Sequence, residues 1–190
     1  KIYFNNSLGD ITGVNLNNGE LLWQIPTQSS LIYESAFSLE TSDIITDGKN
    51  LFFSNNKNQL FSIDIINGII IWENKVNSSL RSIIVDDYLF SISLEGYFII
   101  TDKKSGNIIR VNDVFKNFKI KERKNIKPRG FVVGQDRVYL STSNGKLLTV
   151  NINTGKSISV LKIDNDSISR PFVKNKNLFL IKNSAIVKLN

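Results

Sequence analysis

The sequence contains neither cysteine nor histidine, and these two absences restrict its chemistry. Without cysteine the chain has no disulfide framework and no thiolate metal ligand, which fits an envelope protein and a cytosolic protein equally well. Without histidine it lacks the commonest general base and the commonest metal ligand. Any catalysis would therefore have to use Asp, Glu, Lys or Tyr side chains.

Methionine is absent as well, and the chain opens with Lys1-Ile2-Tyr3-Phe4, which is already strand-like. We therefore expect that a segment upstream of this run is missing. No apolar run approaches the roughly 20 residues of a membrane span, and no signal-peptide pattern is present. Membrane association is expected only through an anchor in the missing segment.

The sequence does contain an internal repeat. Each copy begins with Gly or Asn, has Asp or Asn six positions later and Gly at position ten, and is rich in the residue types that favour strands. Asn, Ser or Thr precedes that second Gly, which supplies the positive φ of a tight turn. Each copy is therefore predicted to be a strand, a turn and a strand. The copies are residues 9–23, 58–72, 96–110 and 145–159, with a fifth beginning at 184–190.

The segments between the copies read as further pairs of apolar strands, which gives a period of four strands. The turn glycines recur about every 40 to 50 residues, the period of four-stranded propeller blades. A β-sandwich is the alternative for many short strands, but the internal period argues against it. We predict an all-β chain, a β-propeller of four-stranded antiparallel blades, incomplete, with about four to five blades of which the first and last are partial. The predicted single domain covers residues 1–190, with blade units near 1–28, 40–76, 81–114, 129–163 and 170–190.

The pattern Gly-x-x-x-x-(Val/Ile)-(Asp/Asn)-x-x-(Thr/Asn)-Gly-x-x-x-Trp, seen in residues 9–23 and 58–72, resembles the PQQ-like repeat of quinoprotein propellers. It is also similar to the repeat of BamB, the outer-membrane assembly lipoprotein, which has no cofactor. In the third and fourth copies Arg110 and Ser159 replace the Trp, so other side chains must dock the blades there. The alternative for the two Trp is a stacking floor for a flat cofactor. The resemblance implies that blade docking uses Trp23, Trp72, Gly19, Gly68, Gly106 and Gly155.

The resemblance implies a non-catalytic binding scaffold in the periplasm, or on the periplasmic face of the outer membrane, with a role in outer-membrane protein assembly. It implies a protein partner and no cofactor. The remaining blades or a second copy would close the ring, and we expect the open ends to recruit a partner. Two alternatives stay open, a fragment of a PQQ-dependent quinoprotein dehydrogenase and a ligand-sensing propeller.

The dehydrogenase alternative would bring calcium ligands, a catalytic Asp and commonly a vicinal disulfide, which a chain without cysteine cannot form. Residues 164–167, Asp-Asn-Asp-Ser, look like the start of a calcium loop but lack the downstream Gly and Glu that complete one. We therefore expect the chain to bind neither quinone nor calcium. The Asp or Asn of each turn is expected to bond nearby backbone amides. These residues are Asn15, Asp64, Asp102 and Asn151.

Residues 116–127 are the densest charge run and are predicted to form a loop between the third and fourth blades. Lysines interleaved with Phe115, Phe118 and Ile120 suit nucleic acid or an anionic membrane surface. The preferred interpretation is a solvated loop in a lysine-rich composition, and no nucleic-acid partner is expected.

Three arginines occupy equivalent places just before the innermost strands of the third, fourth and fifth blades. They are Arg81, Arg129 and Arg170. Residues at these places should surround one mouth of the central channel, where guanidinium groups suit a carboxylate, a phosphate or an acidic partner loop. The alternative is that each arginine pairs separately with an acid such as Asp86, Asp136 or Asp166.

Overall fold

The apolar runs of the sequence form β-strands in the computed structural model, which describes residues 1–6, 8–27 and 39–189. Each predicted strand-turn-strand copy, near residues 9–23, 58–72, 96–110 and 145–159, forms two neighbouring antiparallel strands. The prediction of an all-β chain with repeated sheets is confirmed. The ends of the first and last predicted blade units, residues 28 and 190, lie outside the described residues.

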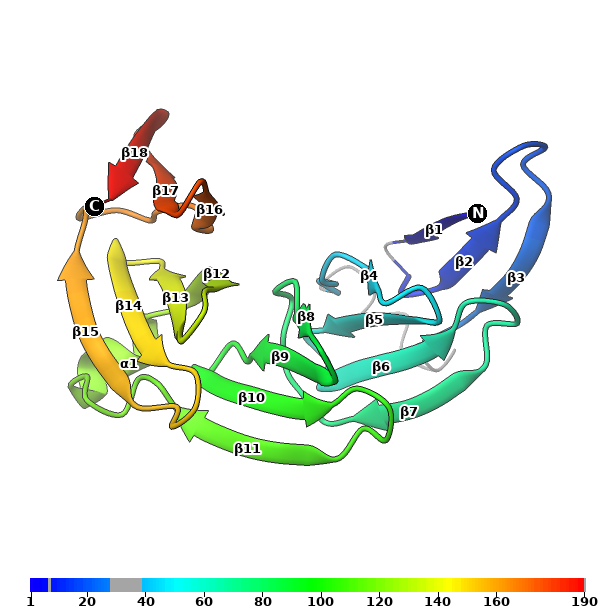
Figure 1. The fold of residues 1–190 in the computed structure, drawn as a ribbon, viewed down its shortest axis with the longest axis horizontal. Helices are drawn as coiled ribbons and strands as arrows, with labels where there is room; N and C mark the ends of the chain where they lie inside the picture. The colour runs from blue at the N-terminus through cyan, green and yellow to red at the C-terminus, as the bar shows by residue number, and fades with distance from the viewer. Residues whose placement is uncertain (7, 28–38, 190) are drawn as a thin grey trace. The chain divides into compact units, whose positions relative to one another are not determined.

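Within the described residues the strands form five sheets, and within each sheet neighbouring strands are consecutive in the chain (Figure 1). The two three-stranded sheets contain β1 (Ile2–Asn5), β2 (Ile11–Val14) and β3 (Leu21–Ile25), and β16 (Phe172–Lys174), β17 (Asn177–Lys182) and β18 (Ala185–Leu189). The second and third sheets contain β4 (Ile45–Thr46), β5 (Asn50–Asn55), β6 (Gln59–Asp64) and β7 (Ile70–Asn74), and β8 (Ile83–Val85), β9 (Tyr88–Ile92), β10 (Tyr97–Asp102) and β11 (Ile108–Asp113). The fourth contains β12 (Pro128–Val133), β13 (Arg137–Thr142), β14 (Lys146–Asn151) and β15 (Ser157–Lys162).

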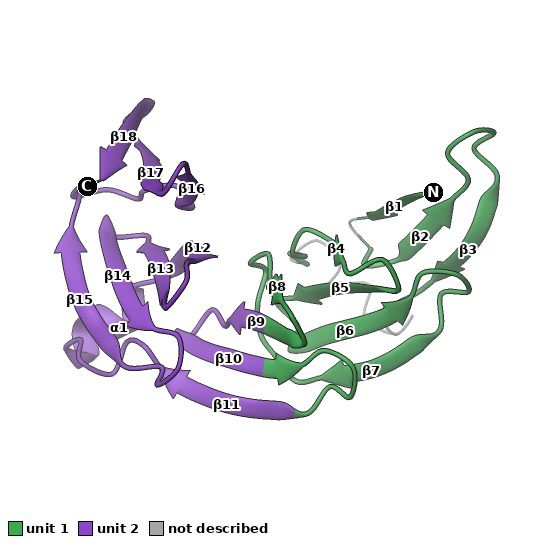
Figure 2. Cartoon of the chain, viewed as in Figure 1, with its two compact units in different colours: residues 1–89, 101–107 green, residues 90–100, 108–190 purple. Residues whose placement is uncertain are grey.

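The chain divides into two compact units, coloured separately in Figure 2. The first contains residues 1–89 and 101–107, and the second contains residues 90–100 and 108–190. In the first unit the core includes Ile11, Trp23, Phe53 and Phe61. In the second, Leu147, Ile168 and Leu180 form a buried cluster between the sheet of β12–β15 and the sheet of β16–β18.

Burial differs between the middle and the outer strands of a sheet. In the middle strands β5, β6 and β14 the central side chains are all buried. Because successive side chains of a strand point to opposite faces, burial of every residue means that both faces of these strands are covered. The last strands β3, β7 and β15 lie at a sheet edge and expose most of their side chains, many of them Ile, Leu or Val.

A β-bulge occurs at the same place in three repeats. The register of the hairpin shifts between Gly13 and Val14, between Ser62 and Ile63, and between Thr149 and Val150. In each case the bulge lies directly beside the residue opposite the Trp position of the repeat. A bulge bends its strand and increases the local twist, so the repeat specifies the same bend each time.

The prediction that residues 116–127 form a loop is wrong in part, because this segment contains a short helix. Helix α1 (Ile120–Asn125) lies between β11 and β12. Its residues are mostly good helix formers, with Glu122 in the first turn and Arg123 and Lys124 in the last turn, where their charges favour the helix dipole. The run lacks the apolar periodicity that identifies a helix in a sequence, and contacts with the neighbouring strands stabilise it.

Candidate functional site

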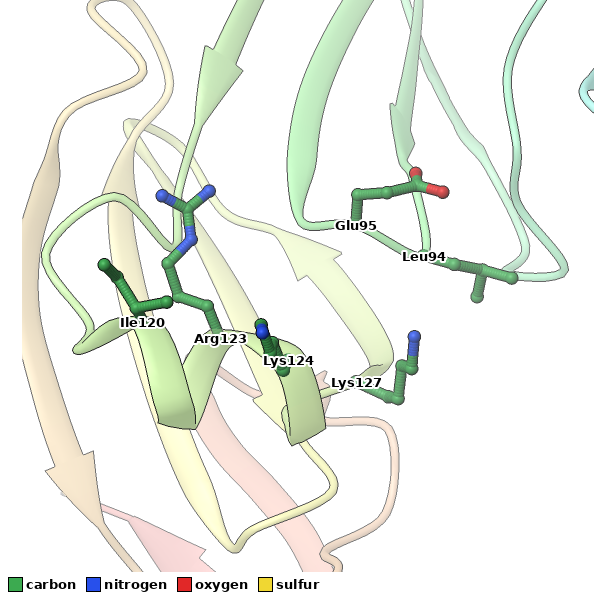
Figure 3. A pocket seen from close by; sticks show the side chains of 6 residues that line it. All are labelled: Leu94, Glu95, Ile120, Arg123, Lys124 and Lys127. Carbon is green, nitrogen blue, oxygen red and sulfur yellow. The ribbon is translucent and has the colours of Figure 1, made fainter.

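The second unit contains a groove between helix α1 and the turn that joins β9 to β10 (Figure 3). Leu94 and Glu95 line it from the turn, and side chains of α1 line the other side together with one lysine just beyond the helix. The groove has a volume of about 400 Å³. Its lining residues are Leu94, Glu95, Ile120, Arg123, Lys124 and Lys127.

The helical wall of the groove is anchored by charged side chains. The Arg123 guanidinium donates to the Asp113 carboxylate at 2.6 Å. The preceding residue, Glu122, accepts from the Lys146 ammonium and from the Asn144 amide, the latter at 2.9 Å. These bonds tie α1 to β11 and to the hairpin of β13 and β14, so the helix keeps a fixed position within its unit.

Aromatic packing anchors the segment that leads into the helix. Phe115 is 1% exposed and lies against Gly96, where a Cβ would come within 2.6 Å of three ring carbons. Its ring meets the edge of Phe118 at a centroid distance of 5.7 Å, and the Lys146 ammonium lies 4.7 Å from the Phe118 ring centre. The Val114 amide donates to the Gly96 carbonyl at 3.0 Å. The segment that leads into α1 therefore packs directly on the turn that forms the other wall of the groove.

The two predicted docking tryptophans make equivalent contacts, both in the first unit. The Trp23 indole N–H donates to the carbonyl of Ile65 at 3.3 Å, and its ring covers Gly68. The Trp72 indole N–H donates to the carbonyl of Lys103 at 3.0 Å, and its ring covers Gly106. In each case the acceptor is the residue after the turn Asp of the next repeat. No side chain fits on those glycines, since a Cβ would lie 2.8 Å or less from the indole carbons.

In the second unit Arg110 occupies the Trp position of the third repeat and bonds the equivalent carbonyl. Its guanidinium donates to the carbonyls of Asn153 and Ile152, the latter at 3.5 Å. Ile152 stands at the same repeat position as Ile65 and Lys103. Arg110 therefore reproduces the hydrogen bond of the tryptophans without their ring. In the fourth repeat, where Ser159 stands, packing of the next sheet rests on the cluster of Leu147, Ile168 and Leu180.

The turn glycines and the Asp or Asn residues shape the hairpins as predicted. All four glycines have positive φ, between 65° and 77°. In the second repeat the Asp64 carboxylate accepts from the amides of Ile66 and Asn67 at 2.8 and 3.1 Å. In the third, the Ser105 amide and hydroxyl, each 2.7 Å from Asp102 Oδ1, hold the pKa of that carboxyl below its ordinary value.

The three predicted arginines lie in different settings. Arg81 is exposed just before β8, and Arg129 is exposed within β12. Arg170 is half-buried, lies against Gly130, and donates from Nε to the carbonyl of Phe131 at 3.2 Å. Asp136, one of the suggested partners, instead pairs with Arg137 at 3.5 Å. Convergence of the three on an acidic partner stays a prediction.

The acidic loop at residues 164–167 uses its first carboxylate within the protein. Asp164 accepts from the amides of Asp166 and Asn165 at 3.3 and 2.7 Å, and these bonds hold its pKa below the ordinary value. Its other oxygen lies 3.4 Å from the Lys182 ammonium. Within the part of the chain that the structure describes, no group of three or more Asp and Glu residues is placed to hold a metal ion.

Only one side of the groove corresponds to a feature that stood out in the sequence, and that feature was interpreted as a solvated loop. The charge run 116–127 stood out in the sequence, but Leu94 and Glu95 carry no motif. They are brought to the groove by the packing of Phe115 on Gly96, and the positive φ of that glycine, 89°, is a signal for a turn but not for a binding site.

In the described residues, no helix is long and apolar enough to span a membrane.

The repeat residues suit the docking of neighbouring repeats, and the groove beside α1 suits the binding of a ligand. The repeat residues are engaged in turns and in packing, and the groove presents cations beside apolar side chains. Repeated sheets of three or four antiparallel strands, in which Trp23, Trp72 and Arg110 donate from one repeat position to the next repeat, are typical of the blades of a β-propeller.

Comparison with known proteins identifies the family. A sequence profile described as outer membrane protein assembly factor BamB matches residues 1–112, more than half of the chain, and the chain belongs to this family. No curated protein sequence matches it.

Solved structures show the same fold. BamB from Moraxella catarrhalis superimposes with a TM-score of 0.63 at 15% identity, over 99% of this chain and 68% of that one. The β-propeller domain of Cps50 (Swd1) from Myceliophteria thermophila gives 0.68 at 13% identity, over 94% and 57%. The computationally designed Ika8 protein gives 0.71 at 10% identity, over 98% and 54%. The chain thus spans about half to two thirds of these structures, and at such identities the likeness concerns the fold alone.

Proposed function

We propose that the chain is a non-catalytic binding scaffold that acts in outer-membrane protein assembly in the bacterial envelope. The observation that carries the proposal is the match of residues 1–112 to the assembly-factor profile. The geometry supports a scaffold, because the Trp, Gly and Asp residues of the repeat are occupied in docking and in turns. In this proposal the chain uses no cofactor, and its partner is a protein.

The outer strands support a role in binding polypeptides. Strands β3, β7 and β15 lie at sheet edges and expose apolar side chains. An exposed edge offers unpaired backbone groups, and an extended segment can add to it as a further strand. The exposed apolar residues of these strands are Leu21, Leu22, Ile70, Ile71, Ile158, Val160 and Leu161.

The proposal is tested in the cells that encode the chain. Fractionation should recover the protein with the envelope, and deletion of its gene should lower the folded fraction of outer-membrane β-barrel proteins. Folding is measured by heat-modifiable mobility in electrophoresis, and re-expression of the gene should restore it. A cytosolic protein, or unchanged folding in the deletion strain, would contradict the proposal.

A second measurement separates the scaffold from a quinoprotein dehydrogenase. Titration calorimetry of the purified protein with PQQ and with calcium is expected to show no binding at micromolar concentrations. Saturable binding of either ligand would instead favour the enzyme, whose chemistry depends on both.

A further inference from the structure

The groove beside α1 carries two lysines that no acid of the described residues neutralises. Arg123 is bound to Asp113, while Lys124 and Lys127 take part in none of the ion pairs formed within the described residues. Glu95 is the acid of the lining, so the lining carries an excess of positive charge. Two exposed ammonium groups that line one groove favour a ligand that carries carboxylates or other anionic groups.

The groove is also apolar in part. Ile120 is 76% exposed although it stands beside the cations, and Leu94 is half-buried on the opposite wall. Covering these side chains would remove apolar surface from water, which favours binding at roughly 25 cal/mol per Å². An inorganic anion cannot gain from this surface. The lining therefore fits a ligand with an apolar group next to its negative charge.

The groove is fixed before any ligand arrives. Two hydrogen bonds to Ser143 hold the backbone of Lys127. The Lys127 amide donates to the Ser143 hydroxyl at 2.9 Å, and the Lys127 carbonyl accepts from the Ser143 amide at 2.8 Å. Ile126 beside it is 2% exposed. On the turn side, the Gly96 amide donates to the Ser93 carbonyl at 2.9 Å. A site ordered in advance loses less entropy when it binds a ligand.

The volume and the charge distribution narrow the class of ligand. A groove of about 400 Å³ is at the lower end of the size of ligand sites, roughly 300 to 1,000 Å³. It can hold a few side chains of an extended peptide. The negative charge of Glu95 in the lining disfavours a multiply charged phosphate.

From these observations we infer that the groove binds a short acidic peptide segment that carries an apolar side chain beside its carboxylates. This inference rests on the proposed function in taking the ligand to be a polypeptide. Lys124 and Lys127 bind the carboxylates, and Ile120 and Leu94 contact the apolar side chain. Arg123 fixes the helix through Asp113 and adds to the positive potential.

Fluorescence anisotropy with defined probes tests the inference on the whole chain. The first probe is the labelled peptide Ser-Gly-Glu-Leu-Glu-Gly-Ser. Matched probes replace both Glu by Gln, or the Leu by Gly. The acidic, Leu-containing peptide should bind most tightly, and its affinity should fall as salt rises, because exposed charge pairs are screened.

The decisive variant is Lys124→Gln with Lys127→Gln, which should weaken the first probe roughly tenfold at low ionic strength. Its matched control is Lys116→Gln with Lys119→Gln, which removes the same charge from exposed residues of the same run that do not line the groove. The control should leave affinity within about twofold of the parent. The Ile120→Ser variant should weaken the Leu-containing probe and leave the Gly-containing probe unchanged. Circular dichroism checks that each variant is folded.

Several results would overturn the inference. They are equal affinity for the Glu and Gln peptides, equal weakening by the groove and control variants, or no saturable binding. Tighter binding to phosphatidylglycerol vesicles or to a single-stranded oligonucleotide, lost in the groove variant, would assign the groove to a membrane or to nucleic acid instead. If the peptide does not bind but deletion of the gene still lowers folding of outer-membrane proteins, the inference is wrong and the proposed function stands. Peptide binding by a protein that is cytosolic refutes the proposed function alone.

Discussion

The first unit joins its repeats through tryptophan and the second through arginine, and the two solutions share one hydrogen bond. Trp23 and Trp72 donate to the carbonyls of Ile65 and Lys103, and Arg110 donates to the equivalent carbonyl of Ile152. The tryptophans also cover the turn glycine of the next repeat, whereas Gly155 of the fourth repeat lies against Asn112. The constant element is therefore a donor aimed at one carbonyl, and the ring adds buried apolar area.

Removal of a docking ring should have the largest effect. Trp23 is 9% exposed, so Trp23→Ala should lower the free energy of unfolding by about 3 to 5 kcal/mol, because it removes a buried ring and leaves a cavity. The matched control is Leu21→Ala on the same strand, at a residue 57% exposed, which should change it by less than about 0.5 kcal/mol. Urea denaturation measures both. Equal losses would show that the ring does not contribute through packing.

A methyl group on the glycine under the ring should have the next largest effect. In Gly68→Ala the new Cβ would lie 2.8 Å from Trp23 at a φ of 76°, so we expect a loss of about 2 to 4 kcal/mol. Gly19→Ala has a φ of 72° and nothing within 4 Å of the Cβ, and should lose only the backbone share, about 1 to 2 kcal/mol. The difference between the two midpoints of denaturation isolates the contact with Trp23, and equal midpoints would refute it.

The arginine junction should be weaker than the tryptophan junction. Arg110→Ala removes the hydrogen bonds to the carbonyls of Ile152 and Asn153 and should cost about 1 kcal/mol, since the side chain is only half-buried. Arg137→Ala serves as the control, because Arg137 forms an exposed pair with Asp136 at 3.5 Å and should cost less than about 0.5 kcal/mol. A loss at Arg110 as large as that at Trp23 would show that the ring is not what separates the two junctions.

Acid should reveal the smallest difference, which lies between turns with Asp and turns with Asn. The Ser105 amide and hydroxyl lower the pKa of Asp102 in the folded state. Stability from this carboxylate is therefore present above the unfolded pKa of about 3.9 and lost as pH falls through the lower folded value. Asp102→Asn keeps the turn bonds, as Asn151 does with Asn153 and Thr154. The variant should lose less stability on acidification than the parent, measured as urea midpoints between about pH 6 and pH 2; an identical acid slope would contradict this.

The fold was largely predictable, because local rules determine it. Strands follow from short runs rich in β-branched and aromatic residues, and the hairpins follow from glycines such as Gly68 that adopt positive φ. The docking role of the repeat residues was inferred only through a resemblance. Their acceptors were not, because a main-chain carbonyl such as that of Ile65 leaves no mark in a sequence.

The parts that could not be predicted depend on contacts between distant residues. Helix α1 is short and charged, so its sequence has no apolar periodicity that predicts a helix. Ion pairs with Asp113 and Lys146 hold it in the folded chain. The groove combines a charge run that was visible in the sequence with Leu94 and Glu95, which were not. The groove forms only when the turn and the helix are placed side by side.

The shared acceptor has a consequence for how such chains evolve. The carbonyl that receives the docking bond belongs to Ile65, Lys103 and Ile152 in successive repeats, so an apolar residue and a charged residue can both stand at this position. Since the acceptor is a main-chain atom, a mutation of its side chain leaves the bond intact. Neighbouring repeats do not need to change together, and a duplicated copy can dock as soon as it is made. Divergence of the side chain at the acceptor position is therefore nearly neutral for docking.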